Sequence, residues 1–265
     1  MTNHRRTFVV GVDATEEGGR ALEWARAAAA PDDIIVALHV WDLPTMVGLD
    51  TATMIPVDQM GDVAQRGLVE SMDRLGDARI EPVVRQGHAG RAIVKLADDR
   101  DADVIAVGHE GSGRASVVLG STANHVVHKS DRTVVVVRGE GWSAPSSVVV
   151  GADDDGLDRS DDNPSVRALR FVAMTWSGAK FDVVHAGDAP DAAERVVASA
   201  ALDPSVAVST RQVDGPPETV LIEASRQADL VVVGSRGRGG FRGLLLGSTG
   251  LDLVSHSECP VAVVR

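Results

Sequence analysis

The segments that stand out in the first half of this 265-residue sequence return in the second half, in the same order. The paired segments are TFVVGVD (7–13) with SVVVGAD (147–153), GGRALEWA (18–25) with PSVRALRFVA (164–173), LHVWDLP (38–44) with VHAGDAP (184–190), DADVIAVG (101–108) with QADLVVVG (227–234), and TVVVVR (133–138) with PVAVVR (260–265). A Leu-Gly-Ser-Thr tetrapeptide also occurs twice, at 119–122 and 246–249. Repetition in a fixed order indicates an internal duplication, so the chain must fold as two similar units.

Each half alternates short apolar runs, rich in β-branched residues, with segments of helical character. This alternation is typical of βαβ units and of a parallel sheet that is covered on both faces. We expect five strands in each half, near 7–13, 34–41, 79–85, 103–108 and 133–138, and near 147–152, 180–186, 205–213, 229–234 and 260–265. A helix is predicted over 58–78, and Asn163-Pro164 predicts the start of another, with Asn as the N-cap.

The two copies are joined by GEGWSAPS (139–146), a stretch of Gly, Ser and Pro that has no apolar period. This composition is typical of a linker. We therefore predict a first domain over 1–138 and a second domain over 147–265. Both lengths lie within the ordinary size range of a globular domain.

The charge balance restricts the partners of this chain. Lys and Arg number 26 against 38 Asp and Glu, which gives a net charge of −12. This acidity argues against nucleic acid or an anionic membrane as the main partner, although a small phosphate ligand needs only a local cradle of N–H groups. The single cysteine permits no internal disulfide, and no apolar run approaches a membrane span. With no signal-like segment at the start, we expect a cytoplasmic protein.

The sharpest motif is GSRGRGGFRGLLLGST, residues 234–249, which follows an apolar strand and precedes a predicted helix. Glycines allow close approach of the backbone to a ligand, and a helix N-terminus offers unpaired N–H groups to an anion. Three arginines in the loop add local positive charge. The spacing, G-x2-G-x9-G-S, is neither the Rossmann nor the Walker A pattern. The loop therefore indicates a nucleotide site, with a plain flexible turn as the alternative.

At this motif the chain resembles the universal stress protein family, whose ATP-binding signature is G-x2-G-x9-G-[ST] after the fourth strand. Residues 233–237 and 259–261 also look like family sequence, and the resemblance covers nearly the whole chain, once per half. It implies two flavodoxin-like, adenine-nucleotide-binding (Rossmann-like) α/β domains. Each would have a five-stranded parallel sheet of order 3-2-1-4-5, with ATP, accompanied by Mg²⁺, at the switch point between the first and fourth strands.

The resemblance implies a set of nucleotide-binding residues in each half. In the second half they are Asp153, Ala186, Gly234, Arg236, Gly237, Gly247, Ser248 and Thr249. In the first half they are Asp13, Val40, Gly108, Gly111, Gly120, Ser121 and Thr122. For the strand-end aspartates, capping of the turn is an equal alternative.

The first half departs from the motif. Only eight residues separate Gly111 from Gly120, and Glu110 stands where the second half has Arg236. A carboxylate about 5 Å from a phosphate would cost up to about 3 kcal/mol at an effective dielectric of about 20, unless Arg114 compensates. We therefore expect the second half to hold the better site, and the first-half site to be weaker or empty.

The second half has a departure of its own, an acidic loop with six Asp between 153 and 162. Its spacing does not fit an EF-hand, because Gly151 would stand at a ligand position. We interpret it as a solvated loop, with a weak Mg²⁺ contact beside ATP as the alternative.

Other polar residues give weaker signals. His125 and His128 could be a metal pair but have no third ligand, which favours surface or packing roles. His39 and His185 occupy matching strand positions and are interpreted as structural. Cys259 precedes an apolar strand and is expected to be a buried, inert thiol. We assign no catalytic residue and no metal ligand.

The sequence therefore predicts an ATP-binding stress-response regulator that is not an enzyme, in which nucleotide occupancy changes conformation or partner binding. The alternatives are a slow ATPase or phosphoryl-transfer enzyme, and a nucleotide-free interaction scaffold. The last strand of each half, near 134–137 and 261–264, is an apolar run that would lie at a sheet edge. Such edges invite pairing, so we expect the halves to join there as a pseudo-symmetric dimer. A homodimer of whole chains is a further expectation.

Overall fold

The computed structural model describes residues 5–13, 16–42, 57–109, 119–154, 157, 163–235 and 246–265. The first half contains β1 (Thr7–Val12), α1 (Glu16–Ala28), β2 (Ile34–Trp41), α2 (Val57–Leu75), β3 (Ile80–Gln86), α3 (Ala89–Asp99), β4 (Val104–Gly108), α4 (Ser121–Lys129) and β5 (Thr133–Val137). The second contains β6 (Ser147–Ala152), α5 (Pro164–Thr175), β7 (Lys180–Ala186), α6 (Ala192–Ala200), β8 (Ala207–Val213), α7 (Pro217–Ser225), β9 (Leu230–Gly234), α8 (Ser248–His256) and β10 (Val261–Val264). All ten predicted strands are confirmed, with ends within two residues.

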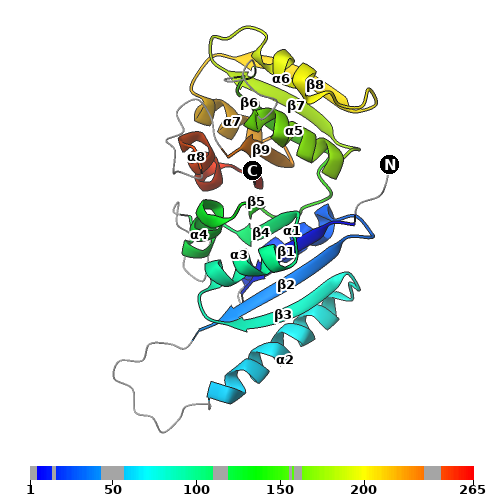
Figure 1. Cartoon of the computed structure of the whole chain (residues 1–265), viewed down its shortest axis with the longest axis vertical. Helices are drawn as coiled ribbons and strands as arrows, with labels where there is room; N and C mark the ends of the chain where they lie inside the picture. Colours follow the sequence, from blue (N-terminus) through cyan, green and yellow to red (C-terminus); the bar gives the residue numbers. More distant parts are fainter. Residues whose placement is uncertain are drawn as a thin grey trace.

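The strands form one ten-stranded sheet of order β3-β2-β1-β4-β5-β10-β9-β6-β7-β8. Each half therefore has the predicted order 3-2-1-4-5, and the strands within each half are parallel. Figure 1 shows the halves stacked along the long axis of the molecule, with β5 at the join and α2 at the far end of the first half. The two-domain α/β architecture is confirmed.

The halves join through β5 and β10, which pair antiparallel. Ala262 lies opposite Val135, and the flanking pairs are Val261 with Val136 and Val263 with Val134. This register is symmetric about the Val135–Ala262 pair, so the pseudo-two-fold axis passes there. The prediction that the final strands pair is confirmed. The pairing also removes both apolar edges from solvent.

Two hydrophobic clusters cover the two faces of this sheet, because successive strand side chains point to opposite faces. Phe8 and Val10 of β1 belong to one cluster and Val9 belongs to the other. The first cluster includes α1, α2, α5 and α6, and the second includes α3, α4, α7 and α8. Both clusters contain residues of both halves, so each core layer continues across the join.

Two local signals set helix ends. Asn163 Oδ1 accepts hydrogen bonds from the backbone N–H of Ser165 and Val166, and Pro164 occupies the first turn, which confirms the predicted N-cap of α5. The helix expected over 58–78 ends earlier, at Leu75, because Gly76 takes a left-handed backbone conformation with φ +61°. No helix in the described part of the chain has the length and apolar composition needed to cross a membrane.

Candidate nucleotide site

A pocket opens at the carboxyl ends of the strands in the first half, where β1 and β4 lie side by side. Its lining residues come from three strand ends and two helix starts: Gly11, Val12, Asp13, Leu38, Val40, Ala89, Ile93, Val107, Gly108, Gly120, Ser121, Thr122 and Ala123. Six of the predicted first-half residues are among them: Asp13, Val40, Gly108, Gly120, Ser121 and Thr122. The structure thus brings together residues that are more than 100 positions apart.

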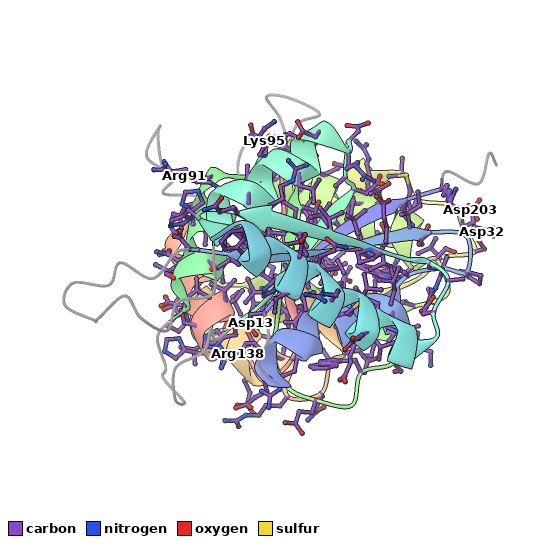
Figure 2. The ribbon with its side chains drawn as sticks, turned by 90° about the horizontal axis from the view of Figure 1, so that it is seen from below. Asp13, Asp32, Arg91, Lys95, Arg138 and Asp203 are labelled. Carbon is purple, nitrogen blue, oxygen red and sulfur yellow. The ribbon has the colours of Figure 1, made fainter. Side chains whose placement is uncertain are left out.

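The position of the pocket follows from the strand order. The chain leaves β1 toward β2 on one side, whereas β4 and β5 lie on the other, so the crossovers diverge at β1 and β4 and leave a crevice. Gly11 lets α3 approach this crevice closely, because a Cβ there would lie 2.8 Å from Ile93 Cδ1. The amino and carboxyl ends of the first-half strands lie on opposite sides of the molecule. In Figure 2, Asp32, which precedes β2, lies on the side opposite to Arg138, which follows β5.

The lining divides into an apolar and a polar part. Leu38, Val107 and Ile93 are buried aliphatic side chains, which can hold a flat apolar group. Asp13, Ser121 and Thr122 supply a carboxylate and two hydroxyl groups. Helix α4 begins here after Gly120, which has no side chain with which to cap the first N–H groups. An anion can therefore approach this helix start.

The two glycine loops are held by the same pair of backbone hydrogen bonds. In the first half, His109 N donates to Val137 O (3.1 Å) and Gly120 N donates to His109 O (2.9 Å). In the second half, Ser235 N donates to Val264 O (2.8 Å) and Gly247 N donates to Ser235 O (3.1 Å). In each half, the first residue of the loop therefore donates to the final strand and accepts from the glycine that ends the loop.

The first residue of the glycine loop differs between the halves: it is His109 in the first half and Ser235 in the second. His109 is only 6% exposed, and burial is the main reason that its pKa falls from 6.5 to about 4. The positive charges of Arg138 and His256 act in the same direction. His109 is therefore a neutral imidazole at pH 7.

In the second half, the residue that follows β6 is hydrogen-bonded to the start of α5. Asp153 N donates to Ser165 Oγ (2.9 Å), and Asn163 Nδ2 donates to Asp153 O (2.9 Å). Gly234, at the end of β9, lies against Pro164, because a Cβ on Gly234 would be 2.5 Å from Pro164 Cβ. Glycine is thus required here by contact with α5, a packing role that the glycine motif alone does not reveal.

The other described second-half residues lie at equivalent ends of strands and helices. Ala186 ends β7, Gly247 precedes α8, and Ser248 and Thr249 begin that helix. Four loop residues lie outside the described residues: Glu110, Gly111, Arg236 and Gly237. Arg114 and most of the acidic loop after Asp154 do so too. The predicted ranking of the two sites depends on these loops and stays a prediction.

Comparison with known proteins agrees with this architecture. A family model described as the universal stress protein family matches residues 4–138 and 165–265. The chain belongs to the universal stress protein family. A universal stress protein of Mycolicibacterium smegmatis is 30% identical over 293 residues, covering 97% of this chain and 96% of the relative. Another from Mycobacterium tuberculosis is 31% identical over 286 residues, with the same coverage.

The solved structures show the same fold over the whole length of this universal stress protein. The crystal structure of a universal stress protein from Archaeoglobus fulgidus superposes with a TM-score of 0.70. It is 23% identical in sequence and is matched over 98% of this chain and 96% of its own. The matched lengths show that the two-unit chain is a tandem form of the family.

The strand-two histidines of this universal stress protein make equivalent contacts. Nδ1 of His39 lies 3.0 Å from Val12 O, and Nδ1 of His185 lies 3.0 Å from Ala152 O. Each ring thus ties the end of the second strand of its half to the end of the first. His185 is almost fully buried, and its Nε2 has no hydrogen-bond partner among the described residues.

The remaining candidates have packing roles. His125 packs against His88, with ring centroids 5.2 Å apart, and burial lowers its pKa. His128 Nδ1 lies 2.8 Å from the carbonyl of Asn124. Within the described ranges, no three His, Cys, Asp or Glu side chains are grouped to hold a metal ion. Cys259 is buried, as predicted, and burial raises the pKa of its thiol to about 12.

Several pocket residues were not predicted, for two different reasons. Val12, Leu38, Val107 and Ala123 neighbour predicted residues, so extending each motif by one or two positions would have found them. Ile93 belongs to α3, which follows β3 and has no motif of its own. Only the return of α3 across the sheet places this residue in the pocket.

Proposed function

We propose that this protein is an ATP-binding stress-response regulator whose nucleotide sites lie at the β1/β4 and β6/β9 switch points. The observation that carries the proposal is the first-half pocket, which combines an aliphatic slot with a carboxylate and the Gly-Ser-Thr start of α4. These are the three environments that a base, a ribose and a polyphosphate require.

The residues present fit such a ligand. Leu38, Val40 and Val107 would contact the base, and Asp13 would accept hydrogen bonds from ribose hydroxyls. The N–H groups and hydroxyls of Ser121 and Thr122 would hold the phosphates. Mg²⁺, when bound, would neutralise part of the phosphate charge. In the second half, the corresponding positions are Asp153, Ala186, Gly247, Ser248 and Thr249, and the loop arginines of the sequence motif support binding there.

We propose regulation without rapid turnover as the activity. Among the described residues that line the first-half pocket, the titratable side chain is Asp13, a carboxylate that we assign to the ribose. His109 is buried and neutral at the start of the loop, and its backbone N–H is bonded to Val137 O. We therefore expect ATP hydrolysis far below the roughly 10 s⁻¹ that is typical of enzymes, measured by phosphate release under multiple turnover.

The test uses a matched pair of blocking substitutions. Val40→Trp and Ala186→Trp place the same large ring at equivalent ends of β2 and β7, where both residues are half-buried. Calorimetric titration with Mg²⁺ and ATP should give two sites in the unmodified chain and one in each variant. Loss of binding in both, with folding retained, would place a single site between the halves. Two sites in both variants, or no binding by the unmodified protein, would contradict the assignment.

A further inference from the structure

Four helices follow the strands β1, β4, β6 and β9 that border the two proposed sites: α1 and α4 in the first half, and α5 and α8 in the second. Helix α4 starts in the first-half pocket, and α1 begins shortly after Asp13, which also lines it. The last carbonyl groups of these four helices have no partner within the helix and must be satisfied by other groups. In each of the four helices, a donor from the opposite half satisfies one of them.

Arg138, which follows β5, caps the C-terminal end of α8 in the second half. Its Nε donates to Ser257 O (2.5 Å) and its Nη1 donates to Val254 O (3.2 Å). A guanidinium at a helix C-terminus also interacts favourably with the helix dipole. The position and direction of α8 are therefore set partly by a first-half side chain, while its other end carries Ser248 and Thr249.

Arg265, the equivalent residue after β10, caps the C-terminal end of α4 in the first half. Its Nη2 donates to Val127 O in the last turn of that helix. The first turn of α4 contains Ser121 and Thr122, which line the pocket. The two arginines thus form a crossed pair about the pseudo-two-fold axis, each acting on the site helix of the other half.

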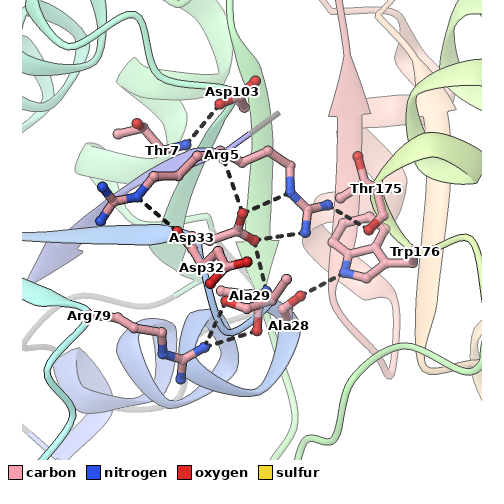
Figure 3. Close-up of polar contacts among 12 residues, drawn as sticks. Arg5, Thr7, Ala28, Ala29, Asp32, Asp33, Arg79, Asp103, Thr175 and Trp176 are labelled. Carbon is pink, nitrogen blue, oxygen red and sulfur yellow. Dashed lines mark hydrogen bonds and ion pairs between the residues drawn. The ribbon is translucent and has the colours of Figure 1, made fainter. Parts of the chain in front are cut away.

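The other two site helices are served by different side chains. Trp176 Nε1, after α5, donates to Ala28 O at the end of α1 (2.9 Å), and Arg6 Nη1 donates to Thr175 O at the end of α5 (2.5 Å). Figure 3 shows Trp176 bonded to Ala28, with Thr175 and the carboxylate of Asp33 in the same view. The buried carboxylate of Asp33 pairs with Arg6 at 2.7 Å. Crossed capping is therefore present on both faces of the sheet and is achieved with unrelated residues.

The backbone adds a direct connection from each arginine to the glycine loop of its own half. His109 N bonds to Val137 O, one residue before Arg138, and Ser235 N bonds to Val264 O, one residue before Arg265. A shift of the first loop therefore moves the strand end that holds α8. The reciprocal path runs from the second loop through Arg265 to α4.

We infer that Arg138 and Arg265 are positioning residues that act in trans: each sets the nucleotide affinity of the other half and couples the two sites. This inference rests on the proposed nucleotide binding. Because binding free energies are linked, occupancy of one site should change the affinity of the other by the same factor in both directions.

The experiment removes the donors but keeps most of the side-chain volume, with Arg138→Met and Arg265→Met. Each is titrated with Mg²⁺ and ATP in the Val40→Trp chain, which reports the second-half site, and in the Ala186→Trp chain, which reports the first. Azido-ATP labelling, mapped by mass spectrometry to each half, gives the same pair of affinities without blocking substitutions.

We expect Arg138→Met to weaken the second-half site by about three- to tenfold, because part of the free energy of the lost hydrogen bonds reaches that site through α8, and to affect the first-half site less. Arg265→Met should show the reverse. Arg138→Lys, which keeps a positive charge, should recover part of the loss. Arg211→Met is the matched control, since Arg211 pairs with Asp182 on the outer strands β7 and β8, and should leave both affinities unchanged.

The outcomes separate this inference from the proposed function. If the unmodified chain binds no ATP, the proposed function is wrong. If ATP binds at both sites but each arginine affects mainly its own half, affects both equally, or affects neither, positioning in trans is wrong. A thermal unfolding scan of each variant at saturating ATP confirms that affinities are compared between folded proteins.

Discussion

The two halves share a backbone frame more closely than they share side chains. Strand order, the symmetric β5–β10 register and the two hydrogen bonds of each glycine loop are the same in both. By contrast, the loop begins with His109 in one half and Ser235 in the other, and α2 has 19 residues where α6 has 9. The comparison shows that the duplication has kept the backbone contacts around the two proposed sites, while the side chains and helix lengths near them have changed.

The join shows the same division. Arg138 and Arg265 are equivalent residues with equivalent roles, whereas Arg6 and Trp176 cap helices at the join with unrelated chemistry. Trp176 also packs edge-on against Trp24, with ring centroids 6.3 Å apart. Each of these helix ends is thus capped from the other half, even where the capping residues of the two halves are unrelated.

The largest expected effect tests the symmetry of the join. Val135→Asp and Ala262→Asp each place a carboxylate at a fully buried position on the pseudo-two-fold axis. An unpaired buried charge costs about 3–5 kcal/mol, so both variants should lose that much free energy of unfolding in urea. Val63→Asp, on the exposed side of α2, is the control and should change stability little.

Should neither charged variant fold, amide exchange of the unmodified protein gives the answer. The N–H groups of β5 and β10 should exchange much more slowly than those of β8, whose side chains are mostly exposed. Fast exchange in both final strands would show that the join is not the stable centre of the molecule.

The second prediction compares two strand glycines that meet different neighbours, Gly234 at the end of β9 and Gly11 in β1. Gly234→Ala should destabilise the protein by about 1–3 kcal/mol, because the new methyl group meets Pro164, including its backbone, at 2.5–2.8 Å. Gly11→Ala should cost less, since its nearest contact is the flexible tip of Ile93. Urea unfolding of both variants checks the order, and equal losses would show that the backbone of α5 yields as easily as a side chain.

These contacts show where sequence reasoning succeeds and where it stops. The strands were predictable because period and β-branched runs are local properties, and the pairing of β5 with β10 was predictable because two valine-rich edges need cover. The strand order was implied by the family resemblance, and the structure confirms it. The domain boundaries at 138 and 147 stay a prediction.

The remaining features depend on contacts between segments far apart in the chain. Nothing near Arg138 or Arg265 in the sequence predicts a helix end from the other half as its partner. Pro164 was read correctly as a helix start, but its contact with Gly234, seventy residues away, was not predictable. The same limit applies to the pocket, where Ile93 is placed by the packing of α3 and not by a motif.

The smallest expected effect tests whether pH separates the halves. The pKa of His109 is about 4 in the folded protein and near 6.5 when the chain unfolds, so between these values the unfolded chain binds more protons. The contribution of His109 to stability is therefore complete above about pH 6.5 and is lost as the pH falls toward 4.

His109→Ser reproduces the residue of the second half, which does not titrate. The difference in unfolding free energy between the unmodified protein and this variant should shrink by on the order of 1–2 kcal/mol from pH 7 to pH 4, and groups common to both proteins cancel. Amide exchange at pH 5 locates the effect: β4 should lose more protection than β9 in the unmodified chain, and the two should respond alike in His109→Ser. A constant difference across this pH range would show that His109 is solvated in solution and that the two loops are electrostatically equivalent.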